Sequence, residues 1–248
     1  MRKIGVFDSG IGGLTVMKSL LEHKLFEEII YYGDTARVPY GVKDANTIIR
    51  YALEAVEFFK NFDIDLLVVA CNTVSAYALE AMQESAPFDV VGVVEPGILA
   101  LQKSQTNLDD PILILGTKAT VASKAYEKRL HALGYTRTTA LATGLFVPIV
   151  EDQLTDTPIL TSTIEHYFQG LTPPASIILG CTHFPLITQP ISAYFDHQAR
   201  LIHSGDAIVE YLEQTYTFSR RFEVTQMKFF ASENPDSLKA VARRWLGL

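Results

Sequence analysis

The chain has 248 residues, of which 48% are hydrophobic and 20% charged, a balance typical of a folded protein with a substantial core. Its formal net charge of -7 argues against a nucleic-acid partner, because nucleic-acid-binding surfaces carry an excess of basic residues. No apolar run approaches the ~20 residues of a membrane span, so we expect no membrane partner either.

The first apolar run covers residues 4–7 and is closed by Asp8, which makes it too short for a secretory signal. A protein without such a signal is expected in the cytoplasm, where thiols stay reduced. We therefore expect the two cysteines, Cys71 and Cys181, to be free thiols.

Short β-rich runs alternate with longer helical patterns along the whole chain. In the first half, buried strands are predicted at residues 4–8, 29–33, 66–70 and 90–94. Apolar residues at helical spacing predict a helix over residues 45–60. In the second half, buried strands are predicted at residues 112–116, 138–142, 176–180 and 201–203. This alternation predicts parallel sheets with helices on both faces.

The pattern restarts near Pro111, after a polar stretch at residues 103–110 that predicts a linker. We therefore expect two doubly wound α/β domains with mainly parallel sheets, and a break somewhere in residues 96–110. The final segment, residues 227–248, is predicted as a strand followed by a helix, which could return to complete the first domain.

The two cysteines stand in similar local sequences, residues 66–73 and 176–183. In each, an apolar strand ends in a small residue, which is followed by the cysteine, a polar residue and a predicted helix. Either cysteine alone is more easily explained as an inert buried thiol. A thiol at a helix start, however, lies at the positive end of the helix dipole, which favours the thiolate. Because α/β sheets bind ligands at their carboxyl edge, the pair predicts two thiols facing one cleft.

The glycine-rich segment at residues 7–13 matches no nucleotide-binding loop. Thr15 stands where a dinucleotide fingerprint needs glycine, and no lysine follows the last glycine as a P-loop requires. A tight turn explains part of the pattern. Beyond that, Asp8 could orient an ammonium or hold a proton near Cys71, while Ser9 and the glycine amides could receive an anion.

Further polar residues follow other predicted strands. The turn at residues 32–41 is explained equally well by loop chemistry and by substrate contacts. Asn72, Thr73 and Thr182 could be simple helix caps or carboxylate ligands. His183 could tune or protonate the thiol of Cys181. The six histidines show no close ligand spacing, so we expect no metal site.

Two other residues are more easily given ordinary roles. Glu151 is best explained as a surface glutamate, although it could face the cleft as a second carboxylate. Trp245 is best explained by packing, although it could mark an interdomain or regulatory pocket.

Five motifs, in order along the chain, resemble those of the glutamate racemase family. They are Phe-Asp-Ser-Gly-x-Gly-Gly at 7–13, Tyr-Gly-Asp followed by Pro-Tyr-Gly at 32–41, Ala-Cys-Asn-Thr at 70–73, Leu-Gly-Thr-x-Ala-Thr at 115–120 and Gly-Cys-Thr-His-Phe-Pro-Leu at 180–186. The related aspartate racemases share the paired cysteines but tend to have glutamate where this chain has His183. The histidine therefore favours glutamate as the substrate.

The resemblance implies a cofactor-independent enzyme that interconverts L- and D-glutamate and supplies D-glutamate for peptidoglycan synthesis. It implies an active site in the cleft between two α/β domains, and a homodimer. It also implies that the C-terminal segment rejoins the first domain, which gives expected boundaries of 1–96 plus 208–248 for one domain and 97–207 for the other.

Carried over residue by residue, the resemblance implies that Cys71 and Cys181 are the two acid–base residues, assisted by Asp8 and His183. The substrate-binding residues it implies are Asp8, Ser9, Tyr40, Gly41, Asn72, Thr73, Thr117, Thr120, Thr182 and His183.

The chemistry suits two thiols, because racemisation removes the Cα proton from one face and returns a proton to the other. No lysine-centred pyridoxal site is evident, so the protein's own dipoles must stabilise the carbanion-like transition state. One alternative is a cysteine amidohydrolase with Cys181 as nucleophile, His183 as base and Asp8 as orienter, which leaves Cys71 unexplained. Another is a non-catalytic amino-acid-binding module, which would tolerate loss of either thiol.

Overall fold

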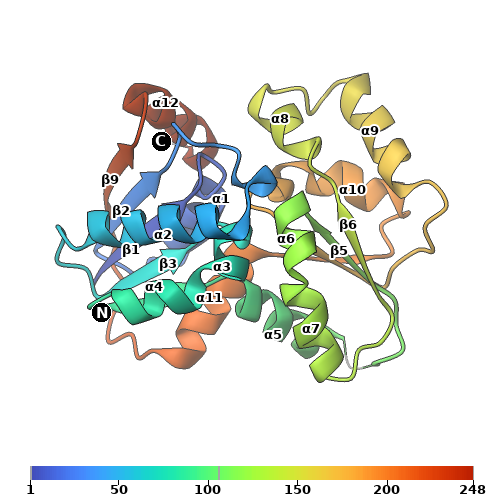
Figure 1. Ribbon diagram of the computed structural model, residues 1–248, viewed down its shortest axis with the longest axis horizontal. Coiled ribbons are helices and arrows are strands. Elements are labelled where there is room, and N and C mark those ends of the chain that lie inside the picture. The colour runs from blue at the N-terminus through green and yellow to red at the C-terminus, as the bar shows by residue number, and fades with distance from the viewer. Residues whose placement is uncertain (1, 106, 248) are drawn as a thin grey trace.

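The computed structural model describes residues 2–105 and 107–247, whose strands form two separate sheets. One sheet has five strands in the order β4-β3-β1-β2-β9, and the other has four in the order β6-β5-β7-β8. All of the strand pairs are parallel. Helices cover both faces of each sheet, and the two lobes lie side by side (Figure 1). The predicted α/β architecture is confirmed.

The first lobe is built from the N-terminal part of the chain and its C-terminal segment. Its strands are β1 (Lys3–Asp8), β2 (Glu28–Gly33), β3 (Leu66–Val69), β4 (Asp89–Gly92) and β9 (Gln226–Ala231). Its helices are α1 (Leu14–Glu22), η1 (Tyr40–Val42), α2 (Ala45–Phe59), α3 (Asn72–Tyr77), α4 (Leu79–Ser85) and α12 (Pro235–Leu246).

The second lobe is continuous in sequence. Its strands are β5 (Ile112–Gly116), β6 (Thr138–Ala142), β7 (Ser176–Gly180) and β8 (Arg200–His203). Its helices are α6 (Lys118–Ser123), α7 (Ala125–Ala132), α8 (Phe146–Glu151), α9 (Pro158–Phe168), η2 (Phe184–Ile187) and α10 (Thr188–Tyr194). Two helices at the junction, α5 (Val94–Ser104) and α11 (Ser204–Thr215), pack against each other.

The alternation of side chains along the central strands explains why both faces are covered. In β5, Leu113 and Leu115 belong to one apolar cluster, whereas Ile112 and Ile114 belong to the cluster on the other face. Successive residues of a strand point to opposite faces, so an uninterrupted apolar strand needs helices on both sides. Among the described helices, none is long and apolar enough to cross a membrane.

The strand predictions need two corrections. The strand predicted at 90–94 ends at Gly92, and α5 already begins at Val94. The strands predicted as buried at 138–142 and 201–203 are β6 and β8, which are only partly buried. Both stand at an edge of their sheet, so each has a hydrogen-bonded neighbour on one side only. The helix predicted at 45–60 is α2, whose first turn is capped by Asp44 accepting from the Thr47 amide.

The C-terminal segment returns to the first lobe, as predicted. Strand β9 pairs with β2, and α12 packs on α1 and β9 (Figure 1). The last predicted residue, 248, lies outside the described part of the chain. The linker predicted at 103–110 starts inside α5, and its residue 106 is also outside the described part. The expected boundaries 96/97 and 207/208 fall within α5 and α11, and the domain limits stay a prediction.

Candidate active site

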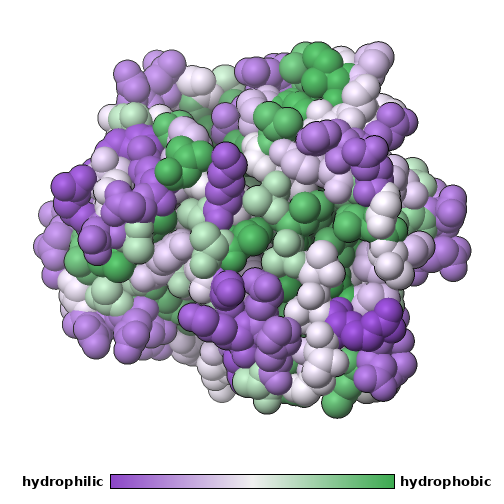
Figure 2. Space-filling view, turned by 45° about the vertical axis from the view of Figure 1, so that its right-hand side comes forward, coloured by the Kyte–Doolittle hydropathy of each residue, from purple (hydrophilic) through white to green (hydrophobic). Residues whose placement is uncertain are grey.

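A cavity of about 580 Å³ lies where the carboxyl ends of strands from the two sheets meet. In open α/β sheets this edge is the usual ligand site. Hydrophobic side chains gather near the middle of the face shown in Figure 2, with hydrophilic side chains around them. The lining includes residues 9–10 after β1, 38–42 after β2, 71–73 after β3, 117–118 after β5 and 180–183 around the end of β7.

Cys71 forms one side of the cavity. It directly precedes α3, and its side chain is buried, as the Cys181 side chain is; both cysteines are free. The Cys71 thiol donates to Ser9 Oγ at 3.5 Å. Burial, reinforced by the negative charge of Asp8, raises the pKa of Cys71 to about 12. Cys71 is therefore a thiol, and not a thiolate, at neutral pH.

Asp8 lies behind the cavity wall rather than in it, because its side chain is fully buried and is not among the described lining residues. Its carboxylate accepts from the Gly10 amide at 2.9 Å and from Thr182 Oγ1 at 3.4 Å. Burial raises the pKa of Asp8, although the charge of His183 and nearby amides work against the rise. Direct contact between Asp8 and a substrate ammonium, which the sequence suggested, is therefore not favoured by this placement.

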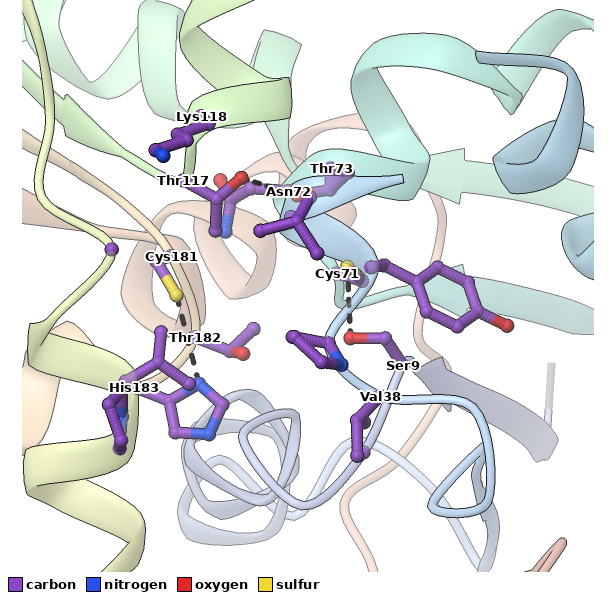
Figure 3. Close-up of a pocket in the computed structure, with 18 of the residues that line it drawn as sticks. Ser9, Val38, Cys71, Asn72, Thr73, Thr117, Lys118, Cys181, Thr182 and His183 are labelled. Carbon is purple, nitrogen blue, oxygen red and sulfur yellow. Dashed lines mark hydrogen bonds between the residues drawn. The ribbon is translucent and has the colours of Figure 1, made fainter. Parts of the chain in front are cut away.

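Cys181 stands on the opposite side of the cavity, beside His183 (Figure 3). The Cys181 sulfur is 3.7 Å from His183 Nδ1, and His183 Nε2 is 2.9 Å from Glu151 Oε1. Burial on its own would lower the pKa of His183, but the hydrogen bonds and charges of Cys181 and Glu151 raise it to about 10. The ring is therefore an imidazolium at neutral pH, with one N–H for Glu151 and the other for the Cys181 sulfur.

Glu151 is a correction to the sequence-based interpretation as an ordinary surface residue. It ends α8, lines the cavity and holds His183. No motif marks Glu151 in the sequence, because its partner is brought close only by the packing of α8 beside η2.

The similarity between the two cysteine segments is also less complete than predicted. Cys71 is followed at once by α3. After Cys181 the chain makes a turn through Thr182 and His183 and then enters the four-residue 3₁₀ helix η2. The imidazolium of His183 thus supplies beside Cys181 the positive charge that the sequence assigned to a helix start.

Hydroxyl groups from both lobes meet at the top of the cavity in Figure 3. Thr73 Oγ1 is 3.0 Å from Thr117 Oγ1 and 2.9 Å from Thr120 Oγ1. Thr73 and Thr117 line the cavity, whereas Thr120 is buried and lies outside the described lining. Thr120 therefore supports the two threonines that face the cavity.

The loop after β2 brings the lobes into close contact. Tyr40 and Gly41 both line the cavity. The Tyr40 hydroxyl donates to Asp34, and burial together with that carboxylate raises the pKa of Tyr40, so the phenol stays neutral. A Cβ atom on Gly41 would lie 2.5 Å from Thr117 Cβ, so only glycine permits this approach.

The remaining predicted residues Ser9, Asn72, Thr182 and His183 also line the cavity. Sequence reasoning missed other lining residues, because they are apolar, occupy a variable motif position or belong to no motif: Leu145, Val147, Pro148, Lys118 and Tyr167. Trp245 packs against apolar clusters of both lobes, with its ring centre 6.5 Å from that of His183. Within the described residues, no group of three or more metal-ligating side chains is found.

Comparisons with known proteins agree on one family. The family model described as Asp/Glu/Hydantoin racemase matches residues 12–212. A glutamate racemase of a Nitratiruptor species is 58% identical over 244 residues, which cover 98% of this chain and 96% of that protein. The crystal structure of glutamate racemase from Campylobacter jejuni subsp. jejuni superposes with a TM-score of 0.98 at 52% identity, covering 100% of this chain and 99% of that one.

A third relative was solved with an amino acid bound. The glutamate racemase of Francisella tularensis subsp. tularensis, in complex with D-glutamate, matches with a TM-score of 0.87 and 29% identity. The match covers 100% of this chain and 94% of that chain.

Proposed function

The chain belongs to the Asp/Glu/Hydantoin racemase family, and within it we propose that it interconverts L- and D-glutamate by proton transfer between Cys71 and Cys181, without a cofactor. The observation that carries the proposal is the placement of two free, buried cysteines on opposite sides of one cavity (Figure 3). The choice of glutamate rests on the relatives, including one solved with D-glutamate.

The reaction needs one thiolate and one thiol. The thiolate removes the Cα proton from one face of the amino acid and becomes a thiol. The other thiol gives its proton to the opposite face and becomes the thiolate. No proton or charge is gained or lost, and the two cysteines end with their protonation states exchanged, ready for the reverse direction.

The surroundings of the cysteines support this division. Cys71, with a pKa of about 12, starts as the proton donor. The imidazolium of His183 can donate to negative charge on the Cys181 sulfur, which is 3.7 Å away. A hydrogen bond from a cation is among the stronger ones in proteins. His183 is therefore proposed to stabilise the negative charge that Cys181 carries when it acts as the base.

Substrate binding is proposed to rely on short polar side chains. Ser9, Thr73, Thr117 and Thr182 present hydroxyls and Asn72 an amide in the wall of the cavity. Such preorganised dipoles stabilise the charge that develops as Cα loses its proton. Among the described residues, Lys118 is the only lysine in the lining, and it suits the distal carboxylate of glutamate.

The amidohydrolase alternative is less well supported. It needs His183 as a base, but a His183 pKa of about 10 leaves the ring already protonated at neutral pH. It also gives Cys71 no task. A binding module without catalysis gives neither buried thiol a task.

Circular dichroism of an L-glutamate solution tests the proposal. We expect the signal to decay to zero on addition of the protein, with the same end point when the reaction starts from D-glutamate. An unchanged signal would overturn the proposal. A parallel assay for ammonia released from L-glutamine, which has the side-chain amide that glutamate lacks, would then separate the amidohydrolase from the binding module.

We further propose that the protein acts in the cytoplasm as a homodimer and supplies D-glutamate for peptidoglycan. These points rest on the family resemblance. Light scattering of the purified protein should give twice the mass of 27.5 kDa, and a monomer mass would overturn the dimer.

A further inference from the structure

Tyr126 on α7 contacts the segments of both cysteines, although it is not among the described residues of the cavity wall. Its ring belongs to the apolar cluster on one face of the second sheet, together with Ile114 and Ile178. Its hydroxyl leaves this core and donates to Asn72 Oδ1 at 2.6 Å. Asn72 follows Cys71 and lines the cavity.

The same ring lies against the residue before Cys181. A Cβ atom on Gly180 would be 3.3 Å from Tyr126 Cε2 and 2.6 Å from the Leu115 carbonyl oxygen. Glycine at 180 therefore lets the end of β7 approach both β5 and the tyrosine ring.

The bond from Tyr126 determines how the Asn72 side chain is oriented. A neutral tyrosine can donate to the amide oxygen, and burial together with Cys181 raises the pKa of Tyr126, which keeps it neutral. Ser204 Oγ lies 3.2 Å from Asn72 Nδ2 and 3.3 Å from Oδ1, so it also contacts the amide. An amide has one oxygen and two N–H donors. With the oxygen held by Tyr126, one N–H can bond Ser204 and the other remains for a ligand.

We propose that Tyr126 is a positioning residue for racemisation: it fixes the Asn72 amide so that an N–H, and not the oxygen, is available to a substrate carboxylate. The proposal rests on the proposed function. A flipped amide would present its oxygen to the carboxylate, which repels it, and substrate binding would weaken in both directions of the reaction.

The test is Tyr126→Phe, which keeps the ring and removes the hydroxyl. Tyr135→Phe is a matched control, because Tyr135 is buried in the same cluster and its hydroxyl donates to the Gln105 carbonyl, also at 2.6 Å. We expect Tyr126→Phe to raise KM about tenfold for both enantiomers, the size of one hydrogen bond, with kcat within about threefold. Tyr135→Phe should lower the melting temperature similarly and leave KM unchanged.

A cycle with Asn72→Ala identifies the route of the effect. In the Asn72→Ala background, Tyr126→Phe should cause no further rise in KM. An unchanged KM in Tyr126→Phe, an equal rise in Tyr135→Phe, or a rise that persists without Asn72 would each overturn the proposal.

Unfolding in urea separates this inference from the proposed function. The changes in unfolding free energy caused by Tyr126→Phe and Asn72→Ala should be non-additive, whether or not the protein acts on glutamate. The two changes in unfolding free energy could be non-additive although the wild type does not racemise glutamate. That result would overturn the proposed function and the kinetic role of Tyr126, but it would support the hydrogen bond between Tyr126 and Asn72. Additive changes would overturn the hydrogen bond itself.

Discussion

The surroundings of Cys71 and Cys181 differ in charge although the backbone brings both cysteines to the same kind of place. Each follows a parallel strand and each is buried. Cys71 has the buried carboxylate of Asp8 behind it, which favours the thiol. Cys181 has the imidazolium of His183 beside it, which favours negative charge on sulfur. Two similar lobes thus place unlike charged groups beside two similarly placed cysteines, a carboxylate near Cys71 and an imidazolium near Cys181.

The two surroundings are also joined. Thr182 lies between Cys181 and His183 in sequence, and its hydroxyl donates to Asp8. Thr15 of the first lobe donates to the Thr182 carbonyl at 2.8 Å. A Cβ atom on Gly12 would lie 2.3 Å from Thr182 Oγ1, so the lobes are in close contact here. A change at Asp8 should therefore affect both thiols.

Removing either Cys71 or Cys181 should lower kcat more than any other change, because the contrast between the two thiols is then lost. Because each direction uses both groups, Cys71→Ser and Cys181→Ser should each lower kcat by about 1,000-fold or more from L- and from D-glutamate. Circular dichroism measures the rates, and calorimetry with D-glutamate should show binding within about threefold of wild type. Near-normal racemisation in either variant would contradict the two-thiol assignment.

Removing the positive charge beside Cys181 should have the next largest effect. His183→Gln keeps a hydrogen-bonding side chain but no charge, so we expect kcat to fall about 100-fold in both directions. Wild-type activity should also persist until the pH approaches about 10, where His183 loses its proton, whereas the variant should lack this limb. The measurement is kcat against pH. Profiles of the same shape for the wild type and His183→Gln would contradict a role for the His183 imidazolium in catalysis.

Removing the negative charge behind Cys71 should have a smaller effect. Asp8→Asn takes away a charge that raises the pKa of Cys71, so this pKa should fall below about 12 while burial keeps it above the ordinary 9.0. Alkylation rates against pH, measured in a Cys181→Ser background so that one thiol reacts, report the value. An unchanged Cys71 pKa would show that burial alone sets it. We expect kcat to fall about tenfold.

The smallest expected effect of the charge on His183 is on the pH dependence of stability. The pKa of His183 is raised from 6.5 to about 10 on folding, so its proton stabilises the fold fully below pH 6.5, and this stabilisation is lost as the pH rises through 10. The urea midpoint should therefore fall between pH 7 and pH 10 more in the wild type than in His183→Gln. An equal fall of the urea midpoint in both proteins would show that the pKa of His183 is not raised by folding.

Much of the fold could be predicted from the sequence because the central strands are apolar on both faces. A short, uninterrupted apolar run such as residues 112–116, bounded by Pro111 and Gly116, is typical of a parallel strand that is covered on both faces. The strand at residues 138–142, Thr-Thr-Ala-Leu-Ala, is less apolar, and its partial exposure follows from its place at the edge of the sheet, which is decided by long-range packing.

The loops that line the cavity could be predicted from the sequence, but whether a given side chain faces the cavity or lies behind its wall could not. The sequence predicts that the loops after β1, β3 and β7 meet at one cavity, because the carboxyl ends of parallel strands share one edge of a sheet, and all three loops do line it. Whether a side chain faces the cavity, as Ser9 does, or lies behind it, as Asp8 does, depends on the turn geometry. The role of Glu151 could not be predicted for a similar reason, since its contact with His183 joins residues from different elements.

Solvent labelling tests the exchange between two thiols most directly. With L-glutamate in deuterated water, we predict that the D-glutamate formed at early times carries one deuterium at Cα, because the delivering thiol has exchanged with solvent. The L-glutamate recovered at the same time should stay unlabelled. The sulfur on its side of Cα removes a proton and does not deliver a solvent-derived one to that face. D-glutamate that keeps the original hydrogen, or L-glutamate labelled as fast as the product forms, would contradict the account.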